Sequence, residues 1–298
     1  MSSDTDRGIA PPGFRLPAAT HIGVVRLQVS DIERSLAYYE GVLGFRPLGA
    51  SRGAAMLGSA GGTPLLELRN RPGAQPVPRR GRLGLFHFAI LLPDRASLGR
   101  LVSHLSSIGE RVGMSDHLVS EAIYLTDPDG LGIEVYADRP RAEWKYEGRE
   151  IAMATLPLDV QSLVEAGGGR QWAGLPNGTT IGHVHLHVGD LEEAAKFYHE
   201  ALGFDKVVWG YPGALFMSAG GYHHHLGTNT WAAGAPPAAE DEARLVEWEM
   251  MLPDAQSVAT AAESVERAGG TVERSPGGSV LARDPWGTAV RLVSARTS

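Results

Sequence analysis

The chain has 298 residues, of which 43% are hydrophobic and 20% are charged, and this length is sufficient for two domains. A formal net charge of −7 argues against a general nucleic-acid binder, and no run of 18 apolar residues is present that would span a membrane. Cysteine is absent, which excludes disulfides, thiolate metal sites and cysteine nucleophiles and leaves His, Asp and Glu as possible metal ligands.

The first 19 residues form a polar lead that contains several prolines. Segments of this composition bury little apolar surface, so residues 1–19 are expected to be poorly ordered. The lead has no apolar stretch flanked by basic residues, as a secretory signal would have. We therefore expect a cytoplasmic protein.

The first predicted strand and helix recur later in the chain. The stretch RLQVSDIERSLAYYEGVLGF (26–45) superimposes on HLHVGDLEEAAKFYHEALGF (185–204) with a constant offset of 159 residues. Alternating apolar residues at the start of each stretch indicate a strand, and apolar residues at helical spacing follow. Asp31 and Asp190 stand between the two patterns, where a helix N-cap is expected.

A second pair of similar stretches follows each of the first two. LFHFAILLPDRASLGRLVSHLSSIG (85–109) matches LVEWEMMLPDAQSVATAAESVERAG (245–269), and each combines a strand with an amphipathic helix. LTDPDGLGIEVYA (125–137) and ARDPWGTAVRLVS (282–294) then each place an Asp-Pro-x-Gly turn before a last strand. The chain is therefore built from four related units.

These units, which we call modules, each contain one strand, one helix and several further strands. Module 1 spans residues 20–80, module 2 spans 81–147, module 3 spans 178–236 and module 4 spans 242–298, with a linker over 148–177. Strands outnumber helices and are joined by short turns. This pattern predicts an α+β protein of four βαβββ modules whose sheets curl around a cavity, and it does not favour a parallel Rossmann sheet.

The sequence resembles the vicinal oxygen chelate superfamily, which includes glyoxalase I, bleomycin-resistance proteins and extradiol ring-cleavage dioxygenases. The resemblance rests on the four modules, the V-x-D-[LI]-E junctions between strand and helix, and the DPDGLGIEVY ending. The stretches GRLGLFHFAI (81–90), TDPDGLGIEVYADRP (126–140) and GGYHHHLGTNTW (220–231) are most similar to the catechol-2,3-dioxygenase-like branch.

The resemblance implies where metal ligands would lie. In this superfamily two modules form a cupped half-barrel around one metal. Ligands come from one fixed position in the first strand of a module and from another in its last strand. We call each set of equivalent positions in the four modules a column. In this chain the first-strand column holds Val24, His87, His183 and Glu247, and the last-strand column holds Glu67, Glu134, Arg291 and one of His223, His224 and His225.

Only one pairing of modules brings suitable ligands together. Modules 2 and 3 would supply His87, His183 and Glu134, and two imidazoles with one carboxylate form the facial triad of non-haem Fe(II) oxygenases. Modules 1 and 4 would supply a poor site of Val24, Glu67, Glu247 and Arg291, whose Glu and Arg are expected to form an ion pair. We therefore predict two cupped half-barrel sheets, with modules 2 and 3 enclosing the metal and modules 1 and 4 paired with each other.

The same resemblance implies residues on the substrate side of the metal. Tyr124 lies ten residues before Glu134, which is the spacing of a tyrosine hydroxyl beside the iron in extradiol enzymes. The stretch SDHLVS (115–120) is similar to the segment that supplies a histidine there, which would be His117. This chain has two more residues than the family pattern between that stretch and Tyr124, a departure that puts the role of His117 in doubt.

The histidines of YHHHLG (222–227) are the hardest to assign. Extradiol enzymes carry a His-His pair here, and the second histidine is the acid–base residue. His224 is therefore favoured for that role, and His225 is the alternative if a β-bulge shifts the register. A further alternative is that these histidines form a hydrogen-bonded cluster that only supports the site. Three residues are predicted to contact substrate in the cavity beside the metal: His185, His225 and Asn229.

The resemblance implies an extradiol ring-cleavage dioxygenase that inserts both atoms of O2 into a catechol at a non-haem Fe(II), giving a ring-opened semialdehyde. Mn(II) is an alternative metal, because it accepts the same ligands. A small aromatic diol and O2 would be the partners, without nucleic acid or membrane, and a homo-oligomer is possible. Two alternatives remain: a glyoxalase-like metal-dependent isomerase or lyase, and a non-enzymatic ligand-sequestering protein of the bleomycin-resistance kind.

Overall fold

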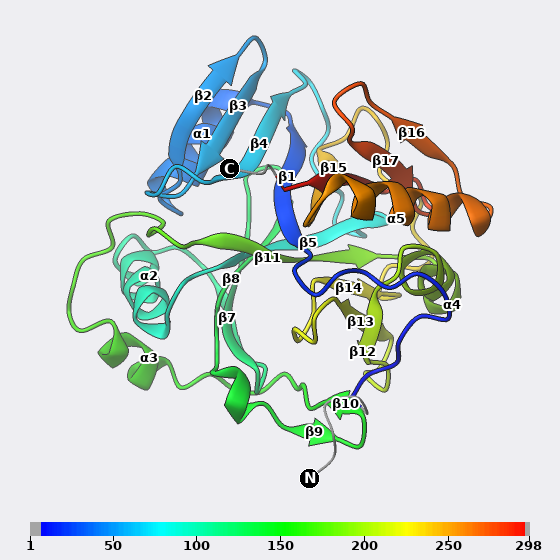
Figure 1. The fold of residues 1–298 in the computed structure, drawn as a ribbon. Helices are drawn as coiled ribbons and strands as arrows, with labels where there is room; N and C mark the ends of the chain where they lie inside the picture. Colours follow the sequence, from blue (N-terminus) through cyan, green and yellow to red (C-terminus); the bar gives the residue numbers. More distant parts are fainter. Residues whose placement is uncertain (1–6, 296–298) are drawn as a thin grey trace.

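The computed structural model describes residues 7–295, which form two eight-stranded sheets (Figure 1). The inner sheet, from modules 2 and 3, has the strand order β12 (Asp205–Val208), β13 (Ala214–Ser218), β14 (Leu226–Asn229), β11 (Thr180–His187), β5 (Gly84–Leu91), β8 (Gly132–Asp138), β7 (Ser120–Thr126) and β6 (Gly113–Asp116). The outer sheet, from modules 1 and 4, has the order β16 (Val272–Arg274), β17 (Val280–Arg283), β18 (Ala289–Ser294), β15 (Arg244–Leu252), β1 (His21–Val29), β4 (Pro64–Asn70), β3 (Ala54–Gly58) and β2 (Arg46–Ser51).

The remaining elements are helices and one small hairpin. The helices are α1 (Ile32–Gly41), α2 (Arg95–Ser107), α3 (Val160–Ala166), α4 (Leu191–Ala195), α5 (Ala255–Arg267), the 3₁₀ turn η2 (Arg141–Glu143) and the π-helix η3 (Lys196–Ala201), and the hairpin pairs β9 (Tyr146–Glu147) with β10 (Glu150–Ile151). Among residues 7–295, none of these helices is both long and apolar enough to cross a bilayer.

The predicted pairing of modules is confirmed by the strand order. In the inner sheet β5 and β11 run antiparallel across the middle of the molecule, and β1 and β15 do the same in the outer sheet (Figure 1). Within every module the first strand pairs in parallel with the last strand. The two candidate ligand columns of each module are therefore neighbours in one sheet. The chain has the predicted α+β fold of two curled sheets made from four modules.

Along the first strand of each module, side chains alternate between the apolar core and the concave face of the sheet, which we call its cup. Val184 and Leu186 of β11 are fully buried in an apolar core that is continuous between the two sheets. His183 and His185 alternate with them and so project from the opposite face. Burial of each such aliphatic side chain stabilises the fold by about 1.5–3 kcal/mol, which fixes the register and hence the face that carries the histidines.

Aspartates begin the helices that follow the first strands of modules 1 and 3, as predicted. The Asp31 carboxylate accepts hydrogen bonds from the backbone N–H groups of Glu33 and Arg34, and Asp190 accepts one from Glu193. Such caps satisfy N–H groups that have no partner within the helix. In module 3 the helix continues as the π-helix η3, a difference from α1 that apolar spacing alone does not predict.

Two Tyr–Asp hydrogen bonds join modules that are consecutive in sequence. The Tyr39 hydroxyl of module 1 donates to Asp127 of module 2 at 3.1 Å, and the Tyr198 hydroxyl of module 3 donates to Asp284 of module 4 at 2.9 Å. Burial raises the pKa of Asp127 to about 6, although backbone N–H groups of its turn oppose that rise. The sheets thus join module 2 with module 3 and module 1 with module 4, and the Asp-Pro-x-Gly turns join module 1 with module 2 and module 3 with module 4.

The lead and the linker are more structured than the sequence predicts. Residues 7–19, expected to be poorly ordered, lie against module 3, where Arg15 forms a two-pronged ion pair with Asp205 at 2.8 Å and Ile9 pairs with Lys206. Residues 1–6 lie outside the described part of the chain. In the linker, α3 packs so closely on α2 that a Cβ at Gly99 would lie 2.0 Å from the Leu163 carbonyl oxygen. The module boundaries themselves stay predictions.

Candidate metal centre

Three predicted ligands meet on the concave face of the inner sheet. His87 on β5, Glu134 on β8 and His183 on β11 are each less than 5% exposed. Glu134 Oε2 lies 3.0 Å from His87 Nε2 and 3.3 Å from His183 Nε2, and the two Nε2 atoms are 3.3 Å apart. Among residues 7–295 they are the group of His and carboxylate side chains whose ligand atoms converge closely enough to hold a metal ion.

The donor set fits a divalent transition metal. Both imidazoles turn Nε2 toward the same carboxylate oxygen, and a cation among the three atoms would accept a lone pair from each of them. Burial lowers the pKa of His183 to about 4, so its ring is neutral near pH 7 and Nε2 can act as a ligand. His183 Nδ1 is buried without a hydrogen-bond partner among residues 7–295, so hydrogen bonds alone do not explain why this imidazole is buried here.

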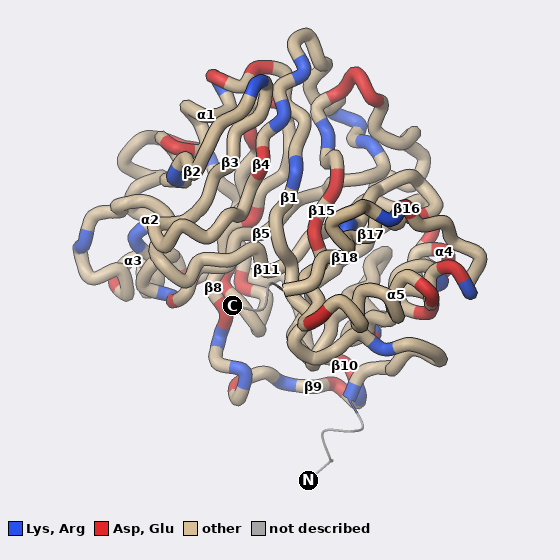
Figure 2. The backbone as a smooth tube through the Cα atoms, turned by 45° about the horizontal axis from the view of Figure 1, so that its top comes forward, with Lys and Arg blue, Asp and Glu red and all other residues tan. Residues whose placement is uncertain are grey.

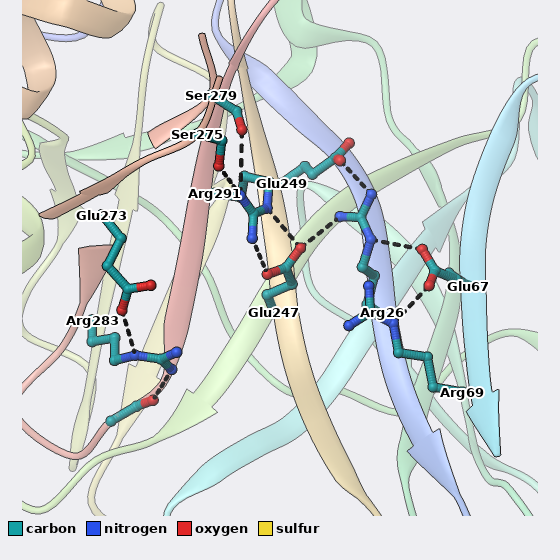
Figure 3. Close-up of polar contacts among 11 residues, drawn as sticks. Arg26, Glu67, Arg69, Glu247, Glu249, Glu273, Ser275, Ser279, Arg283 and Arg291 are labelled. Atoms are coloured by element: carbon teal, nitrogen blue, oxygen red, sulfur yellow. Dashed lines mark hydrogen bonds and ion pairs between the residues drawn. The ribbon is translucent and has the colours of Figure 1, made fainter. Parts of the chain in front are cut away.

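The cup of the outer sheet holds an ion-pair network in place of histidines. Arg291 donates to both oxygens of Glu247 at 2.7 Å, which confirms the predicted ion pair. Arg26 on β1 donates to Glu67 on β4 at 2.8 Å and to Glu249 on β15 at 2.6 Å (Figure 3). Figure 2 shows this basic position on β1 between acidic positions on β4 and β15. Guanidinium groups thus neutralise the carboxylates of this cup.

We expect Arg26→Met to lower the free energy of unfolding by about 3–5 kcal/mol, because it leaves the largely buried carboxylate of Glu249 without its arginine and removes one of two arginines from Glu67. The matched control is Arg69→Met, since Arg69 also pairs with Glu67 but its side chain is 43% exposed. Loss of that exposed pair should cost about 1 kcal/mol or less. Urea unfolding of both variants measures the difference, and equal destabilisation would contradict the buried role of Arg26.

A cavity of about 240 Å³ opens beside the three ligands. Six residues predicted for the site line it: His87, His117, Tyr124, Glu134, His185 and His224. Sequence reasoning missed most of its apolar wall, which consists of Phe86, Met153, Tyr211, Phe216 and Trp231. Met153 lies in the predicted linker, where no periodic pattern marks it.

His117 and Tyr124 form one polar pair at the cavity wall. His117 Nε2 lies 2.6 Å from the Tyr124 hydroxyl, and His117 Nδ1 lies 2.7 Å from the carbonyl oxygen of Ala154. Because a carbonyl only accepts, Nδ1 carries the hydrogen of a neutral His117 and Nε2 accepts from the tyrosine. Burial raises the pKa of Tyr124 well above its ordinary value, so the hydroxyl keeps its proton.

A strained turn holds His117 in place. Leu118 follows it between β6 and β7 and is the non-glycine residue with a positive φ, 69°, among residues 7–295. The Asp116 carboxylate accepts a hydrogen bond from the Leu118 N–H at 2.8 Å, which supports this conformation. A left-handed conformation costs a residue with a Cβ about 1–2 kcal/mol.

Leu118→Gly is expected to raise the free energy of unfolding by about 0.5–1 kcal/mol, because relief of this strain exceeds the entropy that glycine loses on folding. Leu118 is 38% exposed, so little apolar contact is lost. Chemical denaturation checks the sign. Val119→Gly is the control, since Val119 is fully buried and has ordinary backbone angles, and it should be destabilised.

Three consecutive histidines have three different environments. His224 lines the cavity, and its ring centre is 4.0 Å from that of His183. His223 joins His224 to Asp138: the two Nδ1 atoms are 2.8 Å apart, and His223 Nε2 is 2.8 Å from Asp138 Oδ1. Asp138, whose role sequence reasoning missed, is part of the YADRP sequence that follows Glu134 on β8.

This chain of hydrogen bonds assigns the hydrogens on the two rings. An ionised Asp138 only accepts, so a neutral His223 carries its hydrogen on Nε2 and accepts at Nδ1. His224 must then donate from Nδ1, which leaves the lone pair of His224 on Nε2. Burial lowers the pKa of His224 well below its ordinary value, so this ring is neutral near pH 7.

Two residues predicted to contact substrate are not among those lining the cavity in the described chain. His225 instead accepts a hydrogen bond at Nδ1 from the backbone N–H of Ala219 at 3.2 Å. Asn229 lies behind the wall, where its Nδ2 donates to His185 Nε2 at 3.0 Å. His187, which shares a strand face with His183 and His185, also lies off the wall and hydrogen-bonds to Asn229. Asn229 therefore positions the cavity residue His185.

The fold and the site define a protein of paired βαβββ modules with a candidate metal centre in one of its two cups. The chain belongs to the glyoxalase/bleomycin resistance protein/dioxygenase superfamily, whose family model matches residues 21–135 and 180–292. This confirms the family that the motifs of the four modules indicated.

Individual relatives agree with this assignment. Catechol-2,3-dioxygenase of Bacillus subtilis (strain 168) is 47% identical over 248 residues, which cover 82% of this chain and 86% of that protein. Among solved structures, a putative dioxygenase from Bacillus subtilis superimposes with a TM-score of 0.65 at 13% identity, covering 96% of this chain and 87% of the other. Glyoxalase I from Zea mays gives a TM-score of 0.54 at 19% identity, covering 93% and 92%. At these identities the two structures support the fold alone.

Proposed function

We propose that the protein is an extradiol ring-cleavage dioxygenase that opens a catechol with O2 at a non-haem Fe(II). The observation that carries the proposal is the convergence of His87, Glu134 and His183 beside a cavity rich in apolar side chains, which His87 and Glu134 line. The high identity to catechol-2,3-dioxygenase of Bacillus subtilis supports the same activity. Mn(II) is the alternative metal, because it accepts the same nitrogen and oxygen ligands.

The proposed metal would be held by His87, Glu134 and His183. When bound, it would supply the coordination of both diol oxygens and the electron chemistry that activates O2. The protein supplies position: the apolar wall that includes Phe216 and Met153 surrounds the ring and limits the access of water. A ring held against this wall would present its diol edge to the three ligands.

The polar residues of the cavity would handle protons. His224 presents the lone pair of Nε2 and would take a proton from a diol hydroxyl and later return it, while Asp138 and His223 hold its tautomer. Tyr124 keeps its proton and donates it to His117, so its hydroxyl oxygen would accept a hydrogen bond from a diol hydroxyl. His185 would contact the ring. A homo-oligomer stays a prediction.

O2 uptake by the Fe(II)-reconstituted protein with catechol tests the proposal directly. We expect stoichiometric O2 consumption and a yellow ring-opened product. Isomerisation of the hemithioacetal of methylglyoxal and glutathione without O2 uptake would instead indicate a glyoxalase-like enzyme. Tight catechol binding without bound metal or turnover would indicate a ligand-sequestering protein. Either result would refute the dioxygenase proposal.

A further inference from the structure

We infer that a second cavity binds a small organic molecule that carries several oxyanion charges, either a phosphate ester or a polycarboxylate. This cavity has a volume of about 520 Å³ and is lined by residues of the lead, the β9–β10 hairpin, β12 and the turn at residues 220–221. The lead, the hairpin and β12 lie together at one end of the molecule (Figure 1). None of the lining residues belongs to the candidate metal centre or to the cavity beside it, so the inference is independent of the proposed function.

Arginines dominate the charge of this second cavity. Its charged lining residues in the described chain are Arg7, Arg15, Arg141, Arg149 and Asp205. Four guanidinium groups and one carboxylate thus line one cavity, in a chain whose formal net charge is −7. Like charges held close together repel each other, and an anion bound between them removes this repulsion. The charge therefore favours a ligand with more than one negative group.

The turn at residues 220–221 holds Arg141 at the cavity. Arg141 Nη2 donates to the carbonyl oxygens of Gly220 and Gly221 at 2.8 and 2.6 Å. Both glycines have a positive φ, and a Cβ at Gly221 would lie 2.5 Å from Arg141 Nη2, so this close approach requires glycine. Arg141 Nε and Nη1 have no hydrogen-bond partner among residues 7–295. The N–H groups on these two atoms remain as donors for an oxyanion.

The carboxylate that lines the cavity is already neutralised. Asp205 is 5% exposed and accepts hydrogen bonds from Arg15 Nε and Nη2, each at 2.8 Å. Arg7 and Arg149 also have partners within the protein, so they contribute positive charge to the cavity and not free donors. An incoming anion would therefore meet little repulsion from Asp205, and Arg141 would be its main hydrogen-bond donor.

Apolar side chains beside the arginines suit the carbon part of an organic anion. Ile151 and Val207 line the cavity together with Ala142 and Tyr146. The volume of about 520 Å³ lies within the roughly 300–1,000 Å³ that is typical of sites for small organic ligands. Inorganic phosphate alone would leave most of this space empty. An organic phosphate or polycarboxylate would fill more of it and would contact both kinds of wall.

Isothermal titration calorimetry of the full chain with pyrophosphate and with citrate tests the inference. The titrations use about 150 mM NaCl, at which weak attraction between exposed charges is largely screened. We expect saturable binding of about one anion per chain. Tighter binding of pyrophosphate would identify a phosphate ester as the ligand class, and tighter binding of citrate a polycarboxylate. Absence of saturable binding for both anions would overturn the inference.

Arg141→Gln should weaken pyrophosphate binding by at least about tenfold, because it removes a positive charge and its charge-assisted hydrogen bonds. The matched control is Arg274→Gln, since Arg274 on β16 pairs with Glu266 at 2.6 Å and does not line the cavity. This control should bind as tightly as the native protein. Withdrawal of a bound metal by pyrophosphate would affect both variants equally. Equal affinities of the two variants would overturn the inference.

Asp205→Asn tests the sign of the charge effect. This variant removes the carboxylate from the cavity and releases Arg15, so it should strengthen pyrophosphate binding by about threefold or more. Because Asp205 also holds the lead, circular dichroism first checks that the variant is folded. Unchanged or weaker binding by the folded variant would overturn the assignment of this cavity to an anion.

Discussion

His183→Ala should abolish metal binding and turnover together. His183 supplies one of three convergent ligand atoms, and its ring is 1% exposed, so solvent offers no adequate replacement at that position. Loss of an outer partner of a metal ligand already weakens binding by about 10–100-fold, and loss of the ligand itself should exceed this range. Metal content after reconstitution and dialysis, measured by elemental analysis, checks the expectation.

The control for this variant is His187→Ala, on the same strand but outside the three ligands and the cavity wall. It should keep about one metal per chain. Thermal unfolding adds a second readout: a metal at 100 times its dissociation constant stabilises the native state by about 2.7 kcal/mol, a gain that His183→Ala should lack. Metal content and activity equal to those of the native protein would refute His183 as a ligand.

His224→Ala is expected to keep its metal but to turn over roughly 100–10,000-fold more slowly, the usual contribution of a positioned acid–base group. The reason is geometric, because His224 lines the cavity and is held by the hydrogen bonds from Asp138 through His223. Steady-state O2 uptake and metal analysis measure the two quantities separately. Added imidazole should restore part of the turnover, since it can occupy the space of the removed ring.

His225→Ala provides a neighbouring control, because His225 contacts the backbone of Ala219 and does not line the cavity among the described residues. It should retain most of its turnover. Loss of metal in His224→Ala would recast this residue as a ligand. If His225→Ala were the slower variant, the acid–base role would move to that residue.

The internal repeat made the fold predictable, and the resemblance to the superfamily marked the strand positions that supply ligands. His87 and His183 each stand seven residues before the aspartate that begins the following helix, and the inner pairing of modules brings Glu134 beside them. Strand alternation alone does not identify the ligand, because His185 and His187 lie on the same strand face as His183. The aligned columns separated these three histidines.

Other parts of the site depend on contacts between distant segments and so left no local signal. Met153 reaches the cavity because the linker crosses back beside β6, where Leu156 pairs with Asp116. His225 and Asn229 were predicted to contact substrate, but His225 lies in the irregular stretch before β14 and binds the backbone of Ala219, and Asn229 at the end of β14 binds His185 behind the wall. The ordered lead likewise depends on Asp205, about 190 residues away.

Each sheet combines one module from each half of the chain, and this pairing has a consequence for folding during synthesis on the ribosome. When only modules 1 and 2 have emerged, β1 and β5 lack their partners β15 and β11, which lie in the second half of the chain. Each nascent half-protein would then expose two apolar strand edges that can pair with another copy. A truncated chain ending at residue 147 should therefore self-associate, and slow translation through the linker should increase the demand for chaperones.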